Sequence, residues 1–257
     1  MDLAEAAFAL NTQWPTFMLQ DPQSRVYADN LEAFLDWTWL VVSTKDPTEL
    51  LARILAVPFY WDQPLEELPD RGWDDAIERA VRTRSLGHEP NTVCALEITL
   101  ANKARGQGLS SACIDHLRLV AQERGMVNFV APVRPTSKVN YCSESMDQFL
   151  TRIGPDGLSA DPWLRAHQRL GAEIVKIAPL SMTIVGTFDD WFQWTNLDFR
   201  QFGVTAEVNG GLVPVLIDHS NELGVYLEPN VWVRHKVTNL QHESLRARQS
   251  LNRSQTD

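Results

Sequence analysis

The sequence predicts an α/β protein in the broad α+β sense, and three observations lead to this prediction. The stretch from Val93 to Pro132 changes from an apolar run to a helical pattern and back to an apolar run. Further strand-like and helix-like segments flank this stretch on both sides. The composition, 44% hydrophobic and 22% charged over 257 residues, is that of an ordinary globular protein.

The first apolar run predicts a buried strand. Val93–Ala101 is apolar except for Glu97 and Thr99, and it is short and partly β-branched. The run Arg105–Ser110 follows, and its two glycines allow a tight turn that can approach a ligand closely. A strand that ends in such a turn is a frequent beginning of a nucleotide or cofactor site.

A helix and a second strand complete this central stretch. From Leu109 apolar residues recur at helical spacing, Gly125 ends the pattern, and Val127–Val130 predicts the next strand. The first amides of such a helix have no partner within it, and its dipole adds partial positive charge. The glycine turn therefore predicts a phosphate-binding site.

The spacing of the loop distinguishes three kinds of phosphate site. The triphosphate loop, which ends in Gly-Lys-Ser/Thr, is absent, and the dinucleotide pattern would need glycine where Ser111 stands. The remaining pattern is Arg-x-x-Gly-x-Ser over Arg105–Ser110, which closely resembles the pyrophosphate loop of the GCN5-related N-acetyltransferases. That loop usually ends in Gly or Ala, and Ser110 is small enough for the same close approach.

A second segment is similar to the same family. Asp161–Ala172 predicts a capped helix that ends at Gly171, and the family has a helix here that ends in Tyr-x-x-Leu-Gly-Phe. His167 stands where that tyrosine, commonly the acid that protonates the coenzyme A thiolate, usually lies. An imidazole has an ordinary pKa of about 6.5, so His167 is a candidate for this acid. The alternative is an ordinary polar helix residue.

The resemblance implies the GCN5-related fold, with a mixed, mostly antiparallel central sheet, splayed central strands and helices on both faces. We expect one elaborated domain over residues 1–237, with the core motif at 93–132, and a polar, disordered tail at 238–257. An insertion at 133–160 follows the second core strand. It is either a lid on the acceptor side or a surface excursion.

Helices and strands are also expected outside the two matching segments. The expected helices are Gln23–Asp36 after an N-cap at Asp21, Trp73–Thr83 as a packing helix, and a short aromatic helix at Thr187–Trp194. The expected strands are Trp39–Ser43, Leu50–Trp61, Glu173–Ile177, Ser181–Gly186, Gly203–Asp218 and Gly224–Val233.

The family resemblance implies acetyl-coenzyme A as co-substrate and no metal. The pyrophosphate would be held by the backbone of the loop and by the charge of one arginine, and the amide-bearing pantetheine arm by the free edge of the splayed strand. The corresponding residues are Ile98, Thr99, Leu100, Arg105, Gly106, Gln107, Gly108, Leu109 and Ser110.

Glu97 is the candidate base, because an amine must lose a proton before it attacks the thioester. Burial in an apolar strand would raise the pKa of a carboxyl group toward the useful range. Strand alternation would place Glu97 on one face with Ala95 and Thr99, and Leu96, Ile98 and Leu100 on the other. The alternative is a carboxylate paired with a neighbouring cation.

The activity that this resemblance implies is transfer of acetyl to an amine by direct attack in a ternary complex. One alternative is a decarboxylating relative that loads a carrier protein, for which His167 with Thr99 or Thr136 could serve. Another is a coenzyme A-binding module without turnover. Arg134 and Lys138 are candidates to bind a carboxylate of the acceptor.

Charge and cysteine content limit the kinds of partner and the cellular compartment that we expect. The net charge of −10 argues against nucleic acid, and no apolar run approaches the about 20 residues of a membrane span. The acidic N-terminus lacks a signal-peptide pattern, and three cysteines without ligand spacing suggest reduced thiols. We therefore expect a cytoplasmic monomer or homodimer that acts on a small molecule.

Overall fold

The computed structural model describes residues 3–10 and 14–237, and these form one sheet of eight strands. The strand order is β1-β2-β3-β4-β8-β7-β6, and β5 pairs with β8 outside this path. The expected tail at 238–257 lies outside the described residues. None of the helices within the described ranges is both long and apolar enough to cross a bilayer.

The strands are β1 Thr38–Val42, β2 Leu50–Phe59, β3 Thr92–Leu100, β4 Asn128–Val133, β5 Glu173–Thr187, β6 Thr205–Ala206, β7 Val215–Asp218 and β8 Leu223–His235. The α-helices are α1 Leu3–Ala9, α2 Pro22–Asp29, α3 Leu31–Phe34, α4 Gly72–Ser85, α5 Leu109–Glu123, α6 Met146–Leu150, α7 Pro162–Arg169 and α8 Phe188–Thr195. The short 3-10 helices are η2 Thr16–Gln20, η3 Leu35–Trp37, η4 Leu65–Glu67, η5 Asn102–Ala104, η6 Lys138–Tyr141 and η7 Phe199–Gln201.

The predicted mixed, mostly antiparallel sheet is confirmed. In the described sheet only β3 and β4 pair in parallel, and their register covers just Thr92–Cys94 against Asn128–Val130. Beyond Cys94 the two strands separate, so β3 has no β4 partner along its second half. This is the predicted splay, and it exposes backbone groups of β3 between the two strands.

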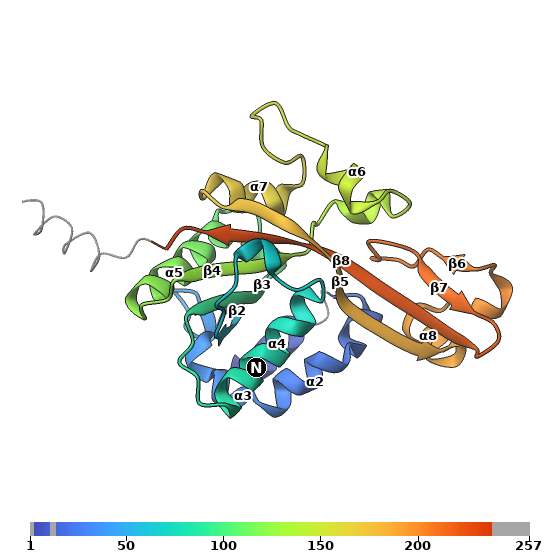
Figure 1. Cartoon of the computed structure of the whole chain (residues 1–257), viewed down its shortest axis with the longest axis horizontal. Coiled ribbons are helices and arrows are strands. Elements are labelled where there is room, and N and C mark those ends of the chain that lie inside the picture. Colours follow the sequence, from blue (N-terminus) through green and yellow to red (C-terminus); the bar gives the residue numbers. More distant parts are fainter. Residues whose placement is uncertain (1–2, 11–13, 238–257) are drawn as a thin grey trace, which may run out of the picture.

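Helices cover both faces of the sheet, as predicted (Figure 1). On one face, Ile114 and Leu117 of α5 and Leu164 of α7 pack on Phe129 and other residues of the strands. On the other face, the apolar side chains of α2, α3 and α4 form a second cluster with strand residues such as Phe59. The apolar faces of these helices are thus buried against the sheet. This packing holds the loops that lead into the helices at the centre of the sheet.

Strands β5 and β8 form a long ribbon that carries a wing made of α8, β6 and β7 (Figure 1). The sequence predicted two strands where β5 is continuous, because Pro179 lies in a bulge between Ala178 and Met182 rather than at a strand end. The predicted strand Gly203–Asp218 is wrong, since β6 and β7 are short and a loop separates them.

The predicted helix Gln23–Asp36 is also wrong in its length. Asp21 caps its start as expected, accepting a hydrogen bond from the Gln23 amide at 2.8 Å. The helix stops at Asn30, whose side chain donates to the Val26 carbonyl at 2.9 Å and whose backbone leaves the helical region. Such local side-chain bonds compete with helix continuation, and the chain continues as α3 and η3.

Two buried carboxyl groups join the N-terminal segment to α4. Asp21 and Asp74 are each 2% exposed, and each has one oxygen without a hydrogen-bond partner among the described residues. Burial raises the pKa of Asp21 to about 6, and burial together with the neighbouring Asp21 raises the pKa of Asp74 to about 9. We expect the two groups to hold one proton between them near pH 7, which would account for both unpartnered oxygens.

The shared proton predicts a protein that loses stability as pH rises. Both pKa values are raised above those of the unfolded chain, so the stabilisation is complete below about pH 4 and is lost through about pH 9. The amide of Asp74→Asn can donate to Asp21 at every pH. This variant should therefore reduce the decline of the free energy of unfolding with pH, by at most about 1.4 kcal/mol per pH unit. Denaturant unfolding across this range measures it. Asp75→Asn is the control, and equal slopes in wild type and Asp74→Asn would refute the shared proton.

Candidate active site

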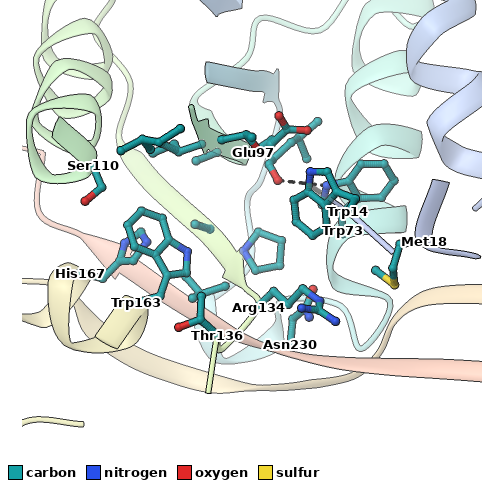
Figure 2. Close-up of a pocket in the computed structure, with 18 of the residues that line it drawn as sticks. Trp14, Met18, Trp73, Glu97, Ser110, Arg134, Thr136, Trp163, His167 and Asn230 are labelled. Atoms are coloured by element: carbon teal, nitrogen blue, oxygen red, sulfur yellow. Dashed lines mark hydrogen bonds between the residues drawn. The ribbon is translucent and has the colours of Figure 1, made fainter. Parts of the chain in front are cut away.

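A cavity of about 560 Å³ opens where β3 and β4 separate. Its lining includes six consecutive β3 residues, from Ala95 to Leu100, together with residues from both faces of the sheet. Figure 2 shows Ser110, Trp163 and His167 on one side and Trp14, Met18 and Trp73 on the other. The cavity therefore passes through the sheet. We call the side of α5 and α7 the donor arm and the side of α4 and the N-terminal segment the acceptor arm.

A bulge at Leu96 decides which β3 side chains face each arm. Leu55 pairs with Glu97 and Ala56 with Ala95, so Leu96 is an extra residue in β3. The predicted alternation is consequently wrong for Ala95 and for Leu96. Ala95 belongs to the other face. It packs with Ile98 in the cluster on the α5 face, whereas Leu96 packs in the cluster on the α4 face. The bulge turns Glu97 toward the acceptor arm.

The glycine loop has the geometry expected of a phosphate site. Gly106 and Gly108 adopt φ of 73° and 78°, and a Cβ at either position would meet no atom within 4 Å. Gly108 is the N-cap of the 15-residue helix α5, and no side chain caps that end. Its first amides therefore keep their hydrogen-bonding capacity for a ligand, and the helix dipole favours an anion there.

The structure brings six of the nine predicted cofactor residues to the cavity wall, namely Ile98, Thr99, Leu100, Arg105, Gly106 and Ser110. Gln107, Gly108 and Leu109 do not line it. The Gln107 side chain donates back to the Lys103 carbonyl at 2.7 Å, and Leu109 packs against the core. These three residues shape the loop, and their role toward the cofactor stays a prediction.

His167 lines the donor arm but is not an imidazole with an ordinary pKa. It is 1% exposed, and its Nδ1 lies 2.9 Å from Nε2 of His235. Burial, with a smaller contribution from His235, lowers the pKa of His167 to about 3. The expectation of a pKa near the working pH is therefore wrong, and His167 is neutral at pH 7.

Glu97 lies in the acceptor arm as one member of an ion pair. Nε and Nη2 of Arg53 donate to its Oε1 at 2.9 and 2.7 Å, and Nη2 also donates to Oε2 at 3.0 Å. Both side chains are mostly buried, with 13% and 14% exposed. The cation comes from the neighbouring strand β2, so the paired alternative considered from the sequence is present, and Glu97 is held rigidly at the cavity wall.

Aromatic side chains form much of the remaining acceptor arm. Trp14 and Met18 come from the N-terminal segment, and Trp73 begins α4 (Figure 2). The indole Nε1 of Trp73 donates to the Leu96 carbonyl at 3.2 Å, which ties α4 to the bulge. Trp73 is therefore part of the cavity wall as well as a packing residue, and two indole faces suit a flat or cationic ligand.

Arg134 and Glu228 form a second ion pair, at the base of the acceptor arm. Nε of Arg134 donates to both carboxylate oxygens at 2.9 and 3.1 Å, and Nη2 donates to the Gly210 carbonyl at 2.5 Å. Glu228 is fully buried and also accepts from Tyr226 and Asn230. These bonds favour a structural role for Arg134 over the predicted role of binding an acceptor carboxylate.

Removing Arg134 is expected to destabilise the fold. Arg134→Met would leave Glu228 buried without its counter-charge, at a cost of about 3–5 kcal/mol. The double variant Arg134→Met, Glu228→Gln removes both charges and should recover most of that loss. Calorimetric melting of the two variants measures the difference. A single variant that melts within a degree or so of wild type would show that the pair contributes little.

Lys138 and most of the insertion do not contribute to the cavity wall. Lys138 is fully buried, and its Nζ donates to the carbonyls of Tyr141 and Leu212 at 2.7 Å each, so the prediction that it binds an acceptor is wrong. Within 133–160 only Val133, Arg134 and Thr136 line the cavity. The rest includes α6, whose Met146 and Phe149 share a hydrophobic cluster with Leu164 of α7, and its role as a lid or as a surface excursion stays a prediction.

Several wall residues were not identified from the sequence. The polar interruption Glu228-Pro229-Asn230 in an apolar strand is a signal of a functional position, because buried polar groups need partners. No comparable signal marks Trp14 in the wall or His235, which contacts His167, because both places depend on distant parts of the chain.

The residues present fit coenzyme A. Uncapped amides at the start of α5, the open space beside Gly106 and Gly108, and the unpaired edge of β3 match its phosphates and its amide-bearing arm. Among residues 3–10 and 14–237, no group of three or more His, Cys, Asp or Glu side chains could hold a metal ion. The three cysteines are free.

Comparison with known proteins shows a relative along most of the chain. "Arginine N-acetyltransferase avaD" from Aspergillus versicolor is 32% identical over 254 residues, which cover 89% of this chain and 87% of the relative. No family model matches the sequence.

Solved structures of low sequence identity were also found. The loading GNATL domain of CurA from Lyngbya majuscula has a TM-score of 0.47 and 16% identity, over 80% of this chain and 78% of that chain. A phosphinothricin acetyltransferase from Sinorhizobium meliloti in complex with AcCoA has a TM-score of 0.37 and 11% identity, over 82% of this chain and 67% of that chain.

Proposed function

The chain belongs to the GCN5-related N-acetyltransferase superfamily and is an acyl-coenzyme A-dependent N-acetyltransferase with acetyl-coenzyme A as co-substrate, and from this premise we propose that its acceptor is a small cationic nitrogen compound of the arginine type. The observation that carries the proposal is the acceptor arm itself. It combines the indole side chains of Trp14 and Trp73 with the carboxylate of Glu97.

The chemistry of these walls supports a cationic acceptor. Indole faces attract ammonium and guanidinium groups by about 0.5–2 kcal/mol, most strongly when water is excluded. Glu228 is fully buried and each of its oxygens accepts two hydrogen bonds, whereas the Glu97 side chain is 14% exposed and its Oε2 accepts one bond from Arg53, so Glu97 is the lining carboxylate better placed to accept from a ligand. The relative named for arginine makes arginine the first compound to test.

We assign three tasks to the residues of the site. The first amides of α5 and the charge of Arg105 hold the pyrophosphate, and the free edge of β3 from Ile98 to Leu100 pairs with the pantetheine amides. Glu97 orients the acceptor nitrogen and takes its proton, directly or through a water. When bound, acetyl-coenzyme A supplies the thioester carbonyl that this nitrogen attacks. We place all three tasks in one elaborated domain over residues 1–237, in the cytoplasm.

A panel of acceptors tests the proposal. The release of free thiol from acetyl-coenzyme A would be followed with arginine, with agmatine, which lacks the carboxylate, and with citrulline, whose side chain is the neutral counterpart. We expect arginine and agmatine to be acetylated and citrulline to have a KM about tenfold higher or more. Mass spectrometry of the products would show which nitrogen carries the acetyl group.

The same assay separates the alternatives. Equal turnover of citrulline and arginine would refute the cationic acceptor. Loss of carbon dioxide from malonyl-coenzyme A without the release of free thiol would indicate the decarboxylating alternative instead. Binding of acetyl-coenzyme A without turnover of any amine would indicate a module that only binds it.

A further inference from the structure

Two histidines from distant parts of the chain meet at the donor arm. His167 of α7 and His235 of β8 are 1% and 3% exposed, and their Nδ1 and Nε2 atoms lie 2.9 Å apart. His167 also packs edge to face with Trp163, at 4.5 Å between ring centroids, and both residues line the cavity. The outer nitrogens, His167 Nε2 and His235 Nδ1, are buried without a hydrogen-bond partner among residues 3–10 and 14–237.

The pair is neutral at pH 7. Burial, with His235, lowers the pKa of His167 to about 3. Burial and the charge of Arg118 on α5 lower the pKa of His235 to about 4, and Asp115 on α5 opposes this shift. Two neutral rings carry two protons. One lies between the rings, so the other must be on one of the two outer nitrogens.

The surroundings of the two outer nitrogens show which histidine donates the hydrogen bond to the other. If His167 donated to His235, the second proton would be on His235 Nδ1 and would form a buried N–H without an acceptor, which is a rare and costly state. If His235 donates to His167, the second proton is on His167 Nε2. That residue lines the donor arm, where a bound ligand can accept from it.

We propose that His235 is a positioning residue that holds His167 in the Nε2–H tautomer, so that neutral His167 donates a hydrogen bond to the sulfur of coenzyme A. In the reaction the nitrogen–carbon bond forms, the carbon–sulfur bond breaks, and the electron pair leaves with the sulfur. The acceptor's proton goes to Glu97 or solvent, and His167 keeps its own. The role toward sulfur rests on the proposed function, whereas the tautomer can be measured in the protein without any substrate.

Nitrogen NMR of the protein with 15N-labelled histidine tests the tautomer without any substrate. The spectrum distinguishes protonated from unprotonated ring nitrogens, and His167→Phe and His235→Phe assign the signals. We expect both rings to be protonated at Nε2 and unprotonated at Nδ1. Protonation of His167 at Nδ1, or an imidazolium in either ring at pH 7, would overturn the proposal.

The pKa of the thiol of bound coenzyme A tests the hydrogen bond to sulfur. A donor at His167 stabilises the thiolate, so this pKa should be lower in wild type than in His167→Phe, and ultraviolet absorbance of the thiolate against pH measures it. His235→Phe should resemble His167→Phe, and kcat should fall about 10- to 100-fold, as for one lost hydrogen bond to a charged group. His235→Gln retains an amide donor and should recover part of both effects.

The controls separate a positioning role from packing and from the assigned acceptor. Equal losses in His235→Phe and His235→Gln, with the thiol pKa unchanged, would show that His235 only fills space. The thiol pKa is measured without an acceptor, so failure of arginine as a substrate would leave this result intact. Thermal melting of each variant shows whether it is folded.

Discussion

Replacing Gly108 with aspartate is expected to abolish the binding of acetyl-coenzyme A, whereas Gly108→Asn should preserve most of it. Gly108 is at φ 78°, and a Cβ there would meet no atom within 4 Å. Aspartate and asparagine are the residues other than glycine that adopt this left-handed conformation most readily, so the two variants share similar strain. They differ in charge. A carboxylate at the N-cap of α5 would bond to the free amides and repel the pyrophosphate.

Thermal melting with and without acetyl-coenzyme A measures this difference. A ligand present at a hundred times its Kd stabilises the folded state by about 2.7 kcal/mol, which raises the melting temperature by several degrees. We expect this shift in wild type, a smaller shift in Gly108→Asn, and none in Gly108→Asp. A shift in Gly108→Asp equal to that of Gly108→Asn would show that the pyrophosphate is held elsewhere.

The cofactor loop could be predicted because its determinants are local. Two glycines that need positive φ, an apolar strand before them and a helical pattern after them all lie within the stretch from Val93 to Pro132. Each element depends on residues a few positions away, so the sequence alone contains the information. The family motif added the identity of the ligand, and the loop in the structure has the expected conformation.

The bulge at Leu96 could not be predicted, because nothing in the sequence distinguishes it from a regular strand position. β3 is a nearly continuous apolar run, and the bulge is visible only in the register against β2. A shift of one residue moves side chains to the other face of the strand, which is why Ala95 and Leu96 were assigned to the wrong faces. Glu97 nevertheless lines the cavity, as a paired carboxylate.

The acceptor arm is built almost wholly from long-range contacts. Trp14, Trp73 and Glu228 come from the N-terminal segment, α4 and β8, and no sequence spacing relates them. The neutral state of His167 depends likewise on burial in the folded chain, where it meets His235, 68 positions away. An ordinary pKa is the only value that a sequence can assign to a histidine, and burial lowers the pKa of His167 to about 3 in this fold.

Replacing Glu97 with glutamine is expected to lower kcat by about 100- to 10,000-fold, the usual contribution of a general base. Glutamine has the same shape and can still accept from Arg53, so the wall of the acceptor arm should persist. The KM for acetyl-coenzyme A should change little, because the donor arm lies on the other face of the sheet. Steady-state kinetics with arginine, or with whichever amine proves to be the acceptor, measures both constants.

Arg53→Gln is the matched control, since it breaks the same ion pair and leaves the carboxylate in the cavity wall. If Glu97 takes the proton, Glu97→Gln should lose far more activity than Arg53→Gln. The rate of Glu97→Gln should recover only at a pH high enough for the acceptor to lose its proton without a base. If Glu97 serves only to hold Arg53, the two variants should lose similar activity. The ratio of their kcat values therefore separates a base from one half of a structural ion pair, which the paired geometry alone does not do.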